Sequence, residues 1–544
     1  MLVALIAFQV IRITSMIGSG FECPYDDTFI SLRYARNLVE GEGLVFNQGE
    51  RVEGFSCFLW VMICSAAIAF GANGPIFSAI ATIVLASVNI VLCWWAGARL
   101  LAADENVKSA ARLLCCLMMI APLYLAYAAL SGMETELYAV LLLLGTVLLY
   151  DELTKKGKSS FLSGLVFALL ALTRPEGVFC FAFLLLWFIG MGVVREKRLG
   201  LHSARGLVRA ASVVFGTFVS YLVFRIMYYG EILPNTHYAK VELGWLNLHA
   251  WAFNVTKLAE DLGWLLILLP LAFIRPQTRR FAAFLIGPVV FAVLSSISVG
   301  GTFGGGGHRL FVPYLFLVGV LCAQGIINIA YILQRALRIP FGNVALPLVM
   351  VCACALLVPQ NTQALKHVYH ARSNARGAKL FFQDKAKDEM RALGEWLREN
   401  VPSDFWIATD RIGKAPFYSR LHTIDMFGLT EPAIARRTVP KGSPQYAPAE
   451  LYPVSHTMKK DWEYTLQMRP QLIIDIIPLS PQLAIRILDL YCQSAVALPD
   501  GRVVELLLRR DLDGAYGLSC KPGGLSKDMI QLGGPQRLDS QSAP

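Results

Sequence analysis

Long apolar runs, separated by short polar loops, fill the chain from its N-terminus to about residue 360. Most of the runs approach the roughly 20 residues that an α-helix needs to cross a lipid bilayer. The pattern therefore predicts a polytopic α-helical membrane domain over residues 1–360. The apolar runs lie near residues 1–20, 55–71, 76–98, 113–130, 137–150, 160–172, 178–194, 207–228, 255–274, 281–299, 310–332 and 343–359.

Basic residues between the runs indicate which loops face the cytoplasm, because Lys and Arg collect on that side of membrane proteins. From residue 113 onward, basic loops alternate with loops poor in Lys and Arg. A chain that starts inside has room for one crossing between its first polar loop and Arg99. The weaker of the two competing runs, 55–71, is therefore predicted to be a juxtamembrane helix on the outer face. This gives about eleven spans, a cytoplasmic N-terminus and an extracytoplasmic C-terminus.

The first outer loop, residues 21–54, holds two adjacent carboxylates, Asp26 and Asp27, directly before a segment with helical spacing. Residues 28–40 are predicted to form this helix, which the sequence "GEG" then ends. One aspartate suits the N-cap position, where it stabilises a helix by about 1 kcal/mol. A second exceeds what capping needs, and an ionised carboxylate can also accept a proton from a hydroxyl group or hold a divalent cation. Capping and chemistry both fit the pair.

Residues 361–520 follow a different pattern from the membrane domain. The segment "DKAKDEMRALGEWLREN" has helical spacing, with Met390, Leu393, Trp396 and Leu397 on one side. Short apolar runs bounded by turn residues follow it and are typical of strands: "FWIAT", "TIDMF", "LIIDII" and "VVELLLRR". The alternation predicts a small α/β domain that caps the outer face of the membrane. Residues 521–544 are predicted to be disordered.

The composition agrees with this architecture. The 544 residues are 55% hydrophobic and 16% charged, whereas soluble proteins carry about 25% charged residues. Basic cytoplasmic loops account for the net charge of +10, so that charge does not indicate a nucleic-acid partner. The 12 cysteines show no metal-ligand spacing. Two pairs, Cys23 with Cys57 and Cys492 with Cys520, can form disulfides if their segments face an oxidising compartment.

Other predicted outer loops bring charged side chains to the same membrane face as the two aspartates. The loop "ALTRPEG" breaks two apolar runs with a proline, and charge at that depth is tolerated where it lines a cavity. Each loop by itself also has an ordinary explanation, as a helix start or a flexible surface turn. The candidate side chains are Glu134, Arg174, Glu176, His237, Lys240, His308 and Arg309.

Carboxylates beside cations at a lipid–water boundary suit one reaction in particular. The cations would hold the phosphate of a lipid-linked donor, and a carboxylate would deprotonate an acceptor hydroxyl. A phosphate ester leaves more easily when Arg, Lys or a metal ion neutralises the charge that develops on it. The outer loops therefore indicate group transfer from a lipid phosphate to a hydroxyl.

Six segments between residues 24 and 437 resemble, in the same order, motifs of the bacterial GT-C glycosyltransferases. The resemblance is greatest to the group that includes the mycobacterial terminal arabinofuranosyltransferase. The segments are "DDTFISLRYARNLVEGEGLVFNQGERVEGF", "SGMETELYAVLLLL", "ALTRPEGVF", "YYGEILPNTHYAKV", "HRLFVPYL" and "IDMFGLTEPAIAR".

This resemblance implies a multi-pass enzyme of the bacterial inner membrane with a GT-C fold and a periplasmic C-terminal domain. It would transfer a sugar, such as arabinofuranose, from a polyprenyl-phosphate donor made inside and flipped outward. The acceptor would be an envelope glycan, a lipid or a protein. The membrane spans would hold the polyprenyl chain, and the 55–71 helix and the α/β cap would frame the acceptor.

The resemblance also assigns roles to residues. The acidic pair of the family falls on Asp26 and Asp27, one as general base and the other to orient it or to help bind a metal ion. Arg174 is the first candidate for the donor phosphate. The remaining assignments are His308 and Arg309 for the same phosphate, Glu134, Glu176, His237 and Lys240 for the substrate pocket, and Asp27 with His308 for a divalent cation (Mg²⁺, Mn²⁺ or Ca²⁺).

Two other functions fit parts of the pattern. A transporter or flippase of lipid-linked sugars would explain the charges of Arg174 and Glu176 at membrane depth. Transporters, however, place polar groups near the bilayer midplane, whereas the charged loops here collect at one face. A non-catalytic assembly subunit with a glycan-binding cap is the third hypothesis, and retained activity of the purified chain would exclude it.

Overall fold

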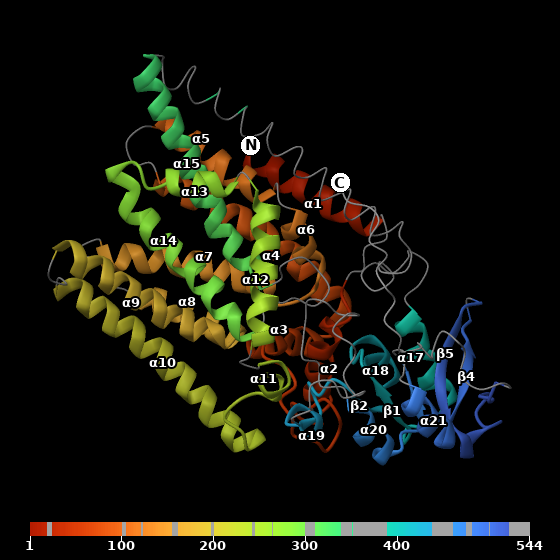
Figure 1. Ribbon diagram of the computed structural model, residues 1–544. Coiled ribbons are helices and arrows are strands. Elements are labelled where there is room, and N and C mark those ends of the chain that lie inside the picture. Colours follow the sequence, from red (N-terminus) through yellow and green to blue (C-terminus); the bar gives the residue numbers. More distant parts are fainter. Residues whose placement is uncertain are drawn as a thin grey trace.

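Helices make up nearly all of the described chain up to residue 338 (Figure 1). The computed structural model describes residues 1–18, 24–100, 105–120, 123–154, 161–196, 201–241, 245–263, 265–299, 310–338, 347, 351, 389–437, 461–474, 481–499 and 501–521. The helices of this part are α1 Leu2–Gly18, α2 Thr28–Val39, α3 Phe58–Ala69, α4 Gly74–Leu100, α5 Glu105–Ile120, α6 Leu123–Leu130, α7 Thr135–Thr154, α8 Leu162–Thr173, α9 Glu176–Glu196, α10 Leu201–Tyr229, α11 Asn235–Lys240, α12 Trp245–Leu262, α13 Leu265–Leu271, α14 Pro276–Ser295 and α15 Val312–Leu337, with a 3₁₀ turn at Ser296–Val299.

The apolar helices pack side by side and form the membrane domain. Five helices of the described chain, α4, α7, α10, α14 and α15, are long and apolar enough to cross a membrane. The shorter apolar helices α1, α3, α8 and α9 accompany them. The predicted run 343–359 lies almost entirely outside the described residues, so the number of eleven spans stays a prediction.

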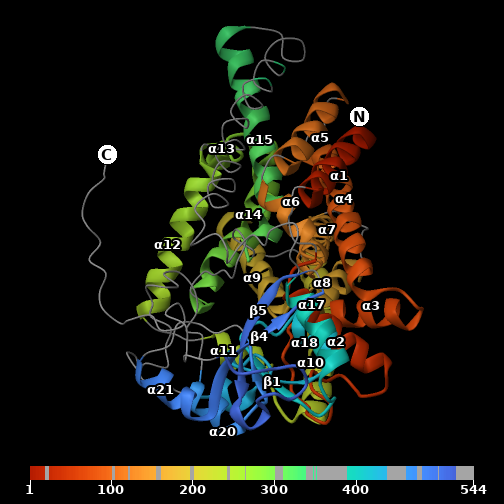
Figure 2. The same ribbon diagram turned by 90° about the vertical axis from the view of Figure 1, so that its right-hand side faces the viewer.

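The predicted helices of the first outer loop are present. Helix α2 covers the segment expected to be helical, and Gly41 and Gly43 follow it with φ of 90° and 93°, a left-handed conformation that favours glycine and ends the helix. Helix α3 lies within the predicted 55–71 segment and runs across the direction of α4 (Figure 2). Its length of 12 residues and this orientation agree with a juxtamembrane helix, which stays a prediction.

The described C-terminal residues form a small α/β domain, which we call the cap, beside the outer-loop helices (Figure 1). Its sheet has the strand order β2-β1-β3-β5-β4, in which β1 pairs in parallel with β2 and β3. Strand β5 pairs antiparallel with β3 and β4. The strands are β1 Trp406–Thr409, β2 His422–Asp425, β3 Leu472–Ile473, β4 Tyr491–Ala497 and β5 Val503–Arg509, and the helices are α17 Glu389–Asn400, α18 Lys414–Ser419, α19 Pro432–Ala435, α20 Trp462–Met468 and α21 Pro481–Leu490, followed by a 3₁₀ turn at Arg510–Leu512.

Helices cover both faces of the cap sheet. Leu393 and Leu397 of α17 pack on one face against Ile407 and Leu472, and Trp462 of α20 packs on the other face. The four predicted strands are thus found as β1, β2, β3 and β5, and the predicted α17 is found with its apolar side buried. A disulfide joins Cys492 to Cys520, one of the two pairings that the sequence left open.

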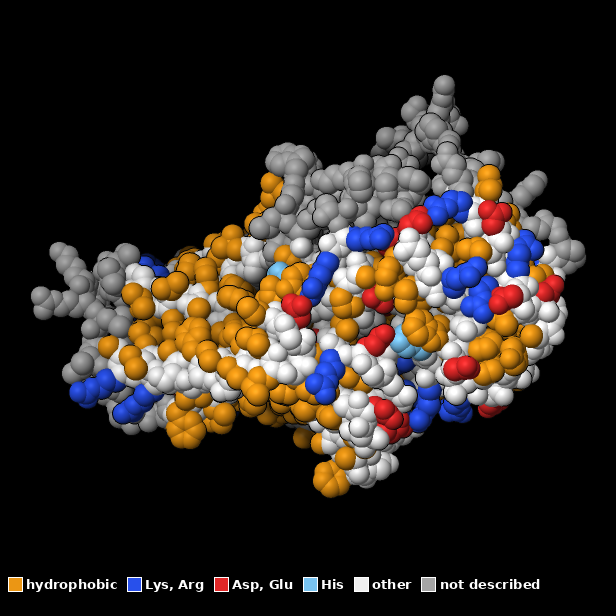
Figure 3. Space-filling view, turned by 90° about the horizontal axis from the view of Figure 1, so that it is seen from below, with side chains coloured by type: hydrophobic (Ala, Val, Ile, Leu, Met, Phe, Trp, Pro, Cys, Tyr) orange, Lys and Arg blue, Asp and Glu red, His pale blue; other side chains and the backbone are white. Residues whose placement is uncertain are grey.

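The surface separates the two parts of the molecule. Figure 3 shows hydrophobic side chains covering one end, with basic and acidic side chains interspersed over the other. Exposed apolar residues of the membrane helices include Phe179, Leu186, Val219 and Met227. Such a surface is expected where helices face lipid, because apolar patches of this extent are rare on soluble proteins.

Candidate active site

The two adjacent aspartates have different surroundings. Asp27 is exposed and occupies the N-cap position of α2, where its side chain makes no capping hydrogen bond. Asp26 is half-buried, and its carboxylate accepts hydrogen bonds from the backbone amides of Gly413 (3.1 Å) and Lys414 (2.8 Å) at the start of α18. A carboxylate that accepts amide hydrogen bonds is favoured in its ionised form. Asp26 therefore joins the first outer loop to the cap, and Asp27 is the more accessible carboxylate.

Gly413 makes the contact with Asp26 possible. A Cβ atom at this position would collide with the main chain and the carboxylate of Asp26. Only a residue without a side chain lets the two backbones approach so closely. The segment "RIGKAP" of the cap thus requires glycine at position 413, and only the folded chain reveals the reason.

Arg174 lies in a cluster of charges at the start of α7 and α9. Its guanidinium donates to Glu134 Oε1 at 2.8 Å and to the Thr135 hydroxyl at 3.0 Å, and its Nη1 lies 3.8 Å from Glu176 Oε1. Arg174 and Glu134 are both about 5% exposed, and Glu176 is half-buried. The structure therefore brings three predicted site residues together, and the positive charge of Arg174 is balanced by two carboxylates.

Main-chain contacts connect this cluster to the aspartates. The Tyr25 amide donates to the Ser131 carbonyl at 3.1 Å, and the Thr28 hydroxyl donates to the same oxygen. The loop that ends in Glu134 thus lies directly against the start of α2. The Arg174 guanidinium lies 5.6 Å from the centre of the Tyr138 ring, and the Tyr138 and Tyr314 hydroxyls are 3.0 Å apart, so the beginning of α15 also reaches the cluster. Three of the predicted outer loops meet here.

The loop that carries His237 and Lys240 lies at the junction with the cap. The side-chain amide of Asn235 donates to the carbonyls of Gly428 (2.8 Å) and Leu429 (3.0 Å) in the cap. His237 is half-buried, and burial lowers the pKa of its imidazole. Lys240 is exposed at the end of α11.

A buried ion pair that the sequence did not reveal supports the same junction. The Arg225 guanidinium approaches Glu53 at 2.6 Å, and the Tyr221 hydroxyl donates to Glu53 Oε1 at 2.6 Å. Glu53 and Arg225 are 3% and 1% exposed. The Glu53 carbonyl accepts from the Asn235 amide at 2.9 Å, so the end of the first outer loop is tied to α10 and α11. One signal was available in the sequence: Arg225 interrupts an apolar run.

Several predictions fall outside the described residues. His308 and Arg309 belong to the segment 300–309, and the proposed Cys23–Cys57 pairing requires Cys23, which also lies outside. The tail beyond residue 521 lies outside as well. Within the described part, no three His, Cys, Asp or Glu side chains converge on a point that would hold a metal ion. Of the proposed metal ligands, the structure therefore describes Asp27 alone.

The fold is similar to that of two solved structures. ArnT from Cupriavidus metallidurans, in a crystal structure with bound undecaprenyl phosphate, superposes with a TM-score of 0.58 at 12% identity, covering 93% of this chain and 97% of that one. The oligosaccharyltransferase AglB from Archaeoglobus fulgidus, in complex with an inhibitory peptide and a dolichol-phosphate, superposes with a TM-score of 0.53 at 10% identity, covering 95% of this chain and 75% of that one.

Sequence comparisons match parts of the chain. The terminal β-(1→2)-arabinofuranosyltransferase of Mycobacterium tuberculosis is 30% identical over 273 residues, which cover 48% of this chain and 42% of that protein. The chain thus matches less than half the length of this relative. A domain of unknown function (DUF8728) matches residues 379–500, which contain most of the cap. The comparisons confirm the predicted GT-C fold and the predicted resemblance to the arabinofuranosyltransferase group.

Proposed function

We propose that this chain is a membrane glycosyltransferase that moves a sugar from a polyprenyl-phosphate donor to an acceptor hydroxyl on the extracytoplasmic side. The observation that carries the proposal is the exposed carboxylate of Asp27, next to an Asp26 held by the cap, in a GT-C fold. The two superposed structures support a polyprenyl-phosphate donor, since one is bound to undecaprenyl phosphate and the other to a dolichol-phosphate. The arabinofuranosyltransferase relative supports arabinofuranose as the sugar.

In the proposed reaction, the acceptor hydroxyl oxygen attacks the anomeric carbon of the donor sugar. Asp27 takes the proton of that hydroxyl, because its carboxylate is the more exposed of the two and a substrate can reach it. The bond between the anomeric carbon and the phosphate oxygen breaks, and its electron pair leaves with the polyprenyl phosphate. Cations beside the phosphate stabilise the negative charge that it gains.

Arg174 remains the first candidate for binding the donor phosphate. Its ion pairs with Glu134 and Glu176 hold the guanidinium in place but also neutralise it. A phosphate would therefore have to share or displace one of these carboxylates, and Glu176 is the more exposed and the more distant of the two. His308, Arg309, His237 and Lys240 are the further proposed contacts of the donor or acceptor, and Glu134 and Glu176 are proposed to line the pocket.

A divalent cation is also proposed for this site. Asp27 would hold it together with His308, and a bound cation would help to neutralise the leaving phosphate. No other His, Cys, Asp or Glu of the described chain joins Asp27 in a group of three. No step of the proposed reaction is therefore assigned to a metal ion.

Single substitutions of the acidic pair test the proposal. Asp27→Asn removes the proton acceptor and is expected to lower sugar transfer by at least about 100-fold, the usual contribution of a general base. The measurement is transfer from a synthetic polyprenyl-phosphate arabinofuranose to an arabinofuranose oligosaccharide by the purified chain. Thermal unfolding in detergent serves as the control for folding. Normal transfer by Asp27→Asn would contradict the assignment of Asp27 as the base, and normal transfer by both Asp27→Asn and Asp26→Asn would overturn the mechanism.

The flippase hypothesis is separated from this proposal by a reconstituted assay. In proteoliposomes, a flippase would change the exposure of a lipid-linked sugar without forming a new glycosidic bond. The proposed enzyme would form the bond and release polyprenyl phosphate. Mass spectrometry of the lipid and glycan products distinguishes the two results.

A further inference from the structure

Arg33 lies on α2, two turns beyond the aspartates, and is almost completely buried, at 3% exposure. Its guanidinium makes five hydrogen bonds, as many as it has N–H donors, and every acceptor is an uncharged oxygen. Most buried arginines are paired with a carboxylate, because removing a charge from water is costly. Hydrogen bonds to neutral groups hold the guanidinium in one orientation but do not neutralise its charge.

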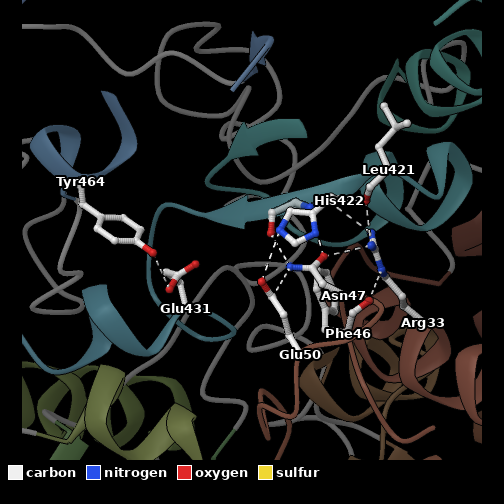
Figure 4. Close-up of polar contacts among 9 residues, drawn as sticks. Arg33, Phe46, Asn47, Glu50, Leu421, His422, Glu431 and Tyr464 are labelled. Carbon is white, nitrogen blue, oxygen red and sulfur yellow. Dashed lines mark hydrogen bonds and ion pairs between the residues drawn. The ribbon is translucent and has the colours of Figure 1, made fainter. Parts of the chain in front are cut away.

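The acceptors belong to two parts of the chain that are far apart in sequence. Two acceptors, the Phe46 carbonyl (2.7 Å) and the Asn47 side-chain oxygen (3.2 Å), lie in the first outer loop. The others lie in the cap: the carbonyls of Pro416 (2.9 Å) and Leu421 (2.8 Å) and the hydroxyl of Thr423 (3.4 Å). Figure 4 shows the guanidinium between Phe46 and Asn47 on one side and Leu421 on the other.

Asn47 extends the same contact along the edge of the cap sheet. Its side-chain oxygen accepts from the Thr423 amide at 3.0 Å, and its side-chain nitrogen donates to the Thr423 carbonyl at 2.9 Å. Strand β2 is an edge strand, and this amide satisfies backbone groups that would otherwise be unpaired. Glu50 of the same loop accepts a hydrogen bond from the Asn47 side-chain nitrogen at 2.9 Å (Figure 4).

Helix α18 is the element through which these contacts reach the aspartates. Its first amides bind the Asp26 carboxylate, and its Pro416 carbonyl binds Arg33. Further along α2, Arg36 donates to the Phe417 carbonyl at 2.6 Å. Residues of α2 and of the turn before it therefore hold α18 at several points, so a shift of the cap would release Asp26 and change the conformation of the loop around Asp27.

We propose that Arg33 is a positioning residue that docks the cap on the first outer loop and thereby fixes Asp27 for proton transfer. This inference rests on the proposed function. Arginine is required here because its rigid guanidinium presents five donors that reach acceptors on both parts, whereas the ammonium of lysine has three donors at one point. Burial lowers the pKa of Arg33 to about 9, which leaves the side chain charged at neutral pH.

The test compares Arg33→Lys with Arg420→Gln in the full-length chain. Arg420 forms an exposed ion pair with Glu40 (2.9 Å), a contact between the same two parts, and exposed pairs contribute little. For Arg33→Lys we expect kcat for sugar transfer to fall about 100-fold, as a displacement of about 1 Å at a reacting group can produce. The KM for the polyprenyl-phosphate sugar is expected to stay unchanged, because the donor contacts lie elsewhere.

Hydrogen exchange supplies the readout that does not depend on activity. In Arg33→Lys the amides of Leu421 and Thr423 are expected to exchange at least about tenfold faster, while amides in the cap core, such as that of Leu507, keep their wild-type rates. Arg420→Gln is expected to match the wild type in both measurements. If Arg33→Lys fails to fold, Asn47→Ala, which loses the pairing with Thr423, is measured in its place with the same expected result.

Two results would overturn the inference. One is wild-type kcat in a variant whose Leu421 and Thr423 amides exchange faster, since docking would then be irrelevant to turnover. The other is a loss of kcat with unchanged exchange, since Arg33 would then act in some other way. If the wild-type chain transfers no sugar, the proposed function fails. The hydrogen-exchange measurement then still decides whether Arg33 docks the cap.

Discussion

The acidic pair shows how two identical neighbouring side chains acquire different roles. The sequence predicted that Asp26 and Asp27 stand at a helix start, and the structure places Asp27 at the N-cap of α2. It did not predict that Asp26 binds amides of another helix, because Gly413 lies 387 residues further along the chain. The division between a held and an exposed carboxylate is therefore a property of the fold.

The buried ion pair between Glu53 and Arg225 leads to a prediction about the free energy of unfolding. Glu53→Gln leaves the Arg225 charge buried without its partner, which is expected to lower the free energy of unfolding by about 3–5 kcal/mol. Glu505→Gln breaks an exposed ion pair with Lys521 and is expected to cost less than about 1 kcal/mol. Denaturant unfolding in detergent compares the two variants.

The double variant Glu53→Leu with Arg225→Met provides a control for charge. Because it removes both charges and keeps apolar volume, it is expected to be more stable than Glu53→Gln. Equal losses for Glu53→Gln and Glu505→Gln would show that the buried pair contributes no more than a surface pair.

Among the elements, strand β2 and the turn after it depend on the buried carboxylate of Asp425. Its oxygens accept from the Phe427 amide (2.9 Å) and the Thr430 amide (2.8 Å), which shapes the turn that leads to Glu431. Glu431 in turn accepts from the Tyr464 hydroxyl of α20 at 3.0 Å (Figure 4). The segment "IDMFGLTEPAIAR" thus organises one edge of the cap.

Asp425 also predicts a pH dependence. Burial raises the pKa of its carboxyl from 3.8 to about 6. Between these values the folded state binds more protons than the unfolded state, so the free energy of unfolding falls as the pH rises from about 4 to 6. Asp425→Asn has no carboxyl at this position and does not show the decrease. Its free energy of unfolding is therefore expected to rise by roughly 2 kcal/mol relative to that of the wild type between about pH 4 and pH 6.

The measurement is denaturant unfolding of both proteins at several pH values, with the exposed Asp404→Asn as the matched control. The control is expected to follow the wild-type curve. Parallel curves for wild type and Asp425→Asn would contradict the prediction, because the carboxyl would then titrate alike in the folded and unfolded states.

The whole molecule consists of a membrane domain and a cap that meet at the first outer loop. Phe29 of α2 packs edge-on against Phe417 of the cap at 5.2 Å, in a cluster that also contains Trp60 of α3. The disulfide between Cys492 and Cys520 fits an oxidising, extracytoplasmic location of the cap. We therefore propose the orientation that the charge pattern predicts, with the N-terminus inside.

Epitope tags test this orientation. A tag at the C-terminus is expected to bind antibody in intact spheroplasts, and a tag inserted at Lys156 is expected to bind only after permeabilisation. Binding at Lys156 from outside would overturn the topology. A third tag after Lys240, on a predicted outer loop, serves as a second positive control.

The sequence by itself determined the features that depend on neighbouring residues. Apolar runs gave the membrane helices, glycines gave the end of α2, and short apolar segments gave the strands β1, β2, β3 and β5, since these signals repeat over a few residues. Strand β4 was not predicted because polar residues such as Gln493 and Ser494 are usually exposed, yet both are buried in the cap, at 3% and 0% exposure. Only the tertiary structure decided that Asp26 is held, that Arg33 binds two distant segments and that Glu53 finds Arg225. These contacts join groups far apart along the chain, and no local pattern specifies them.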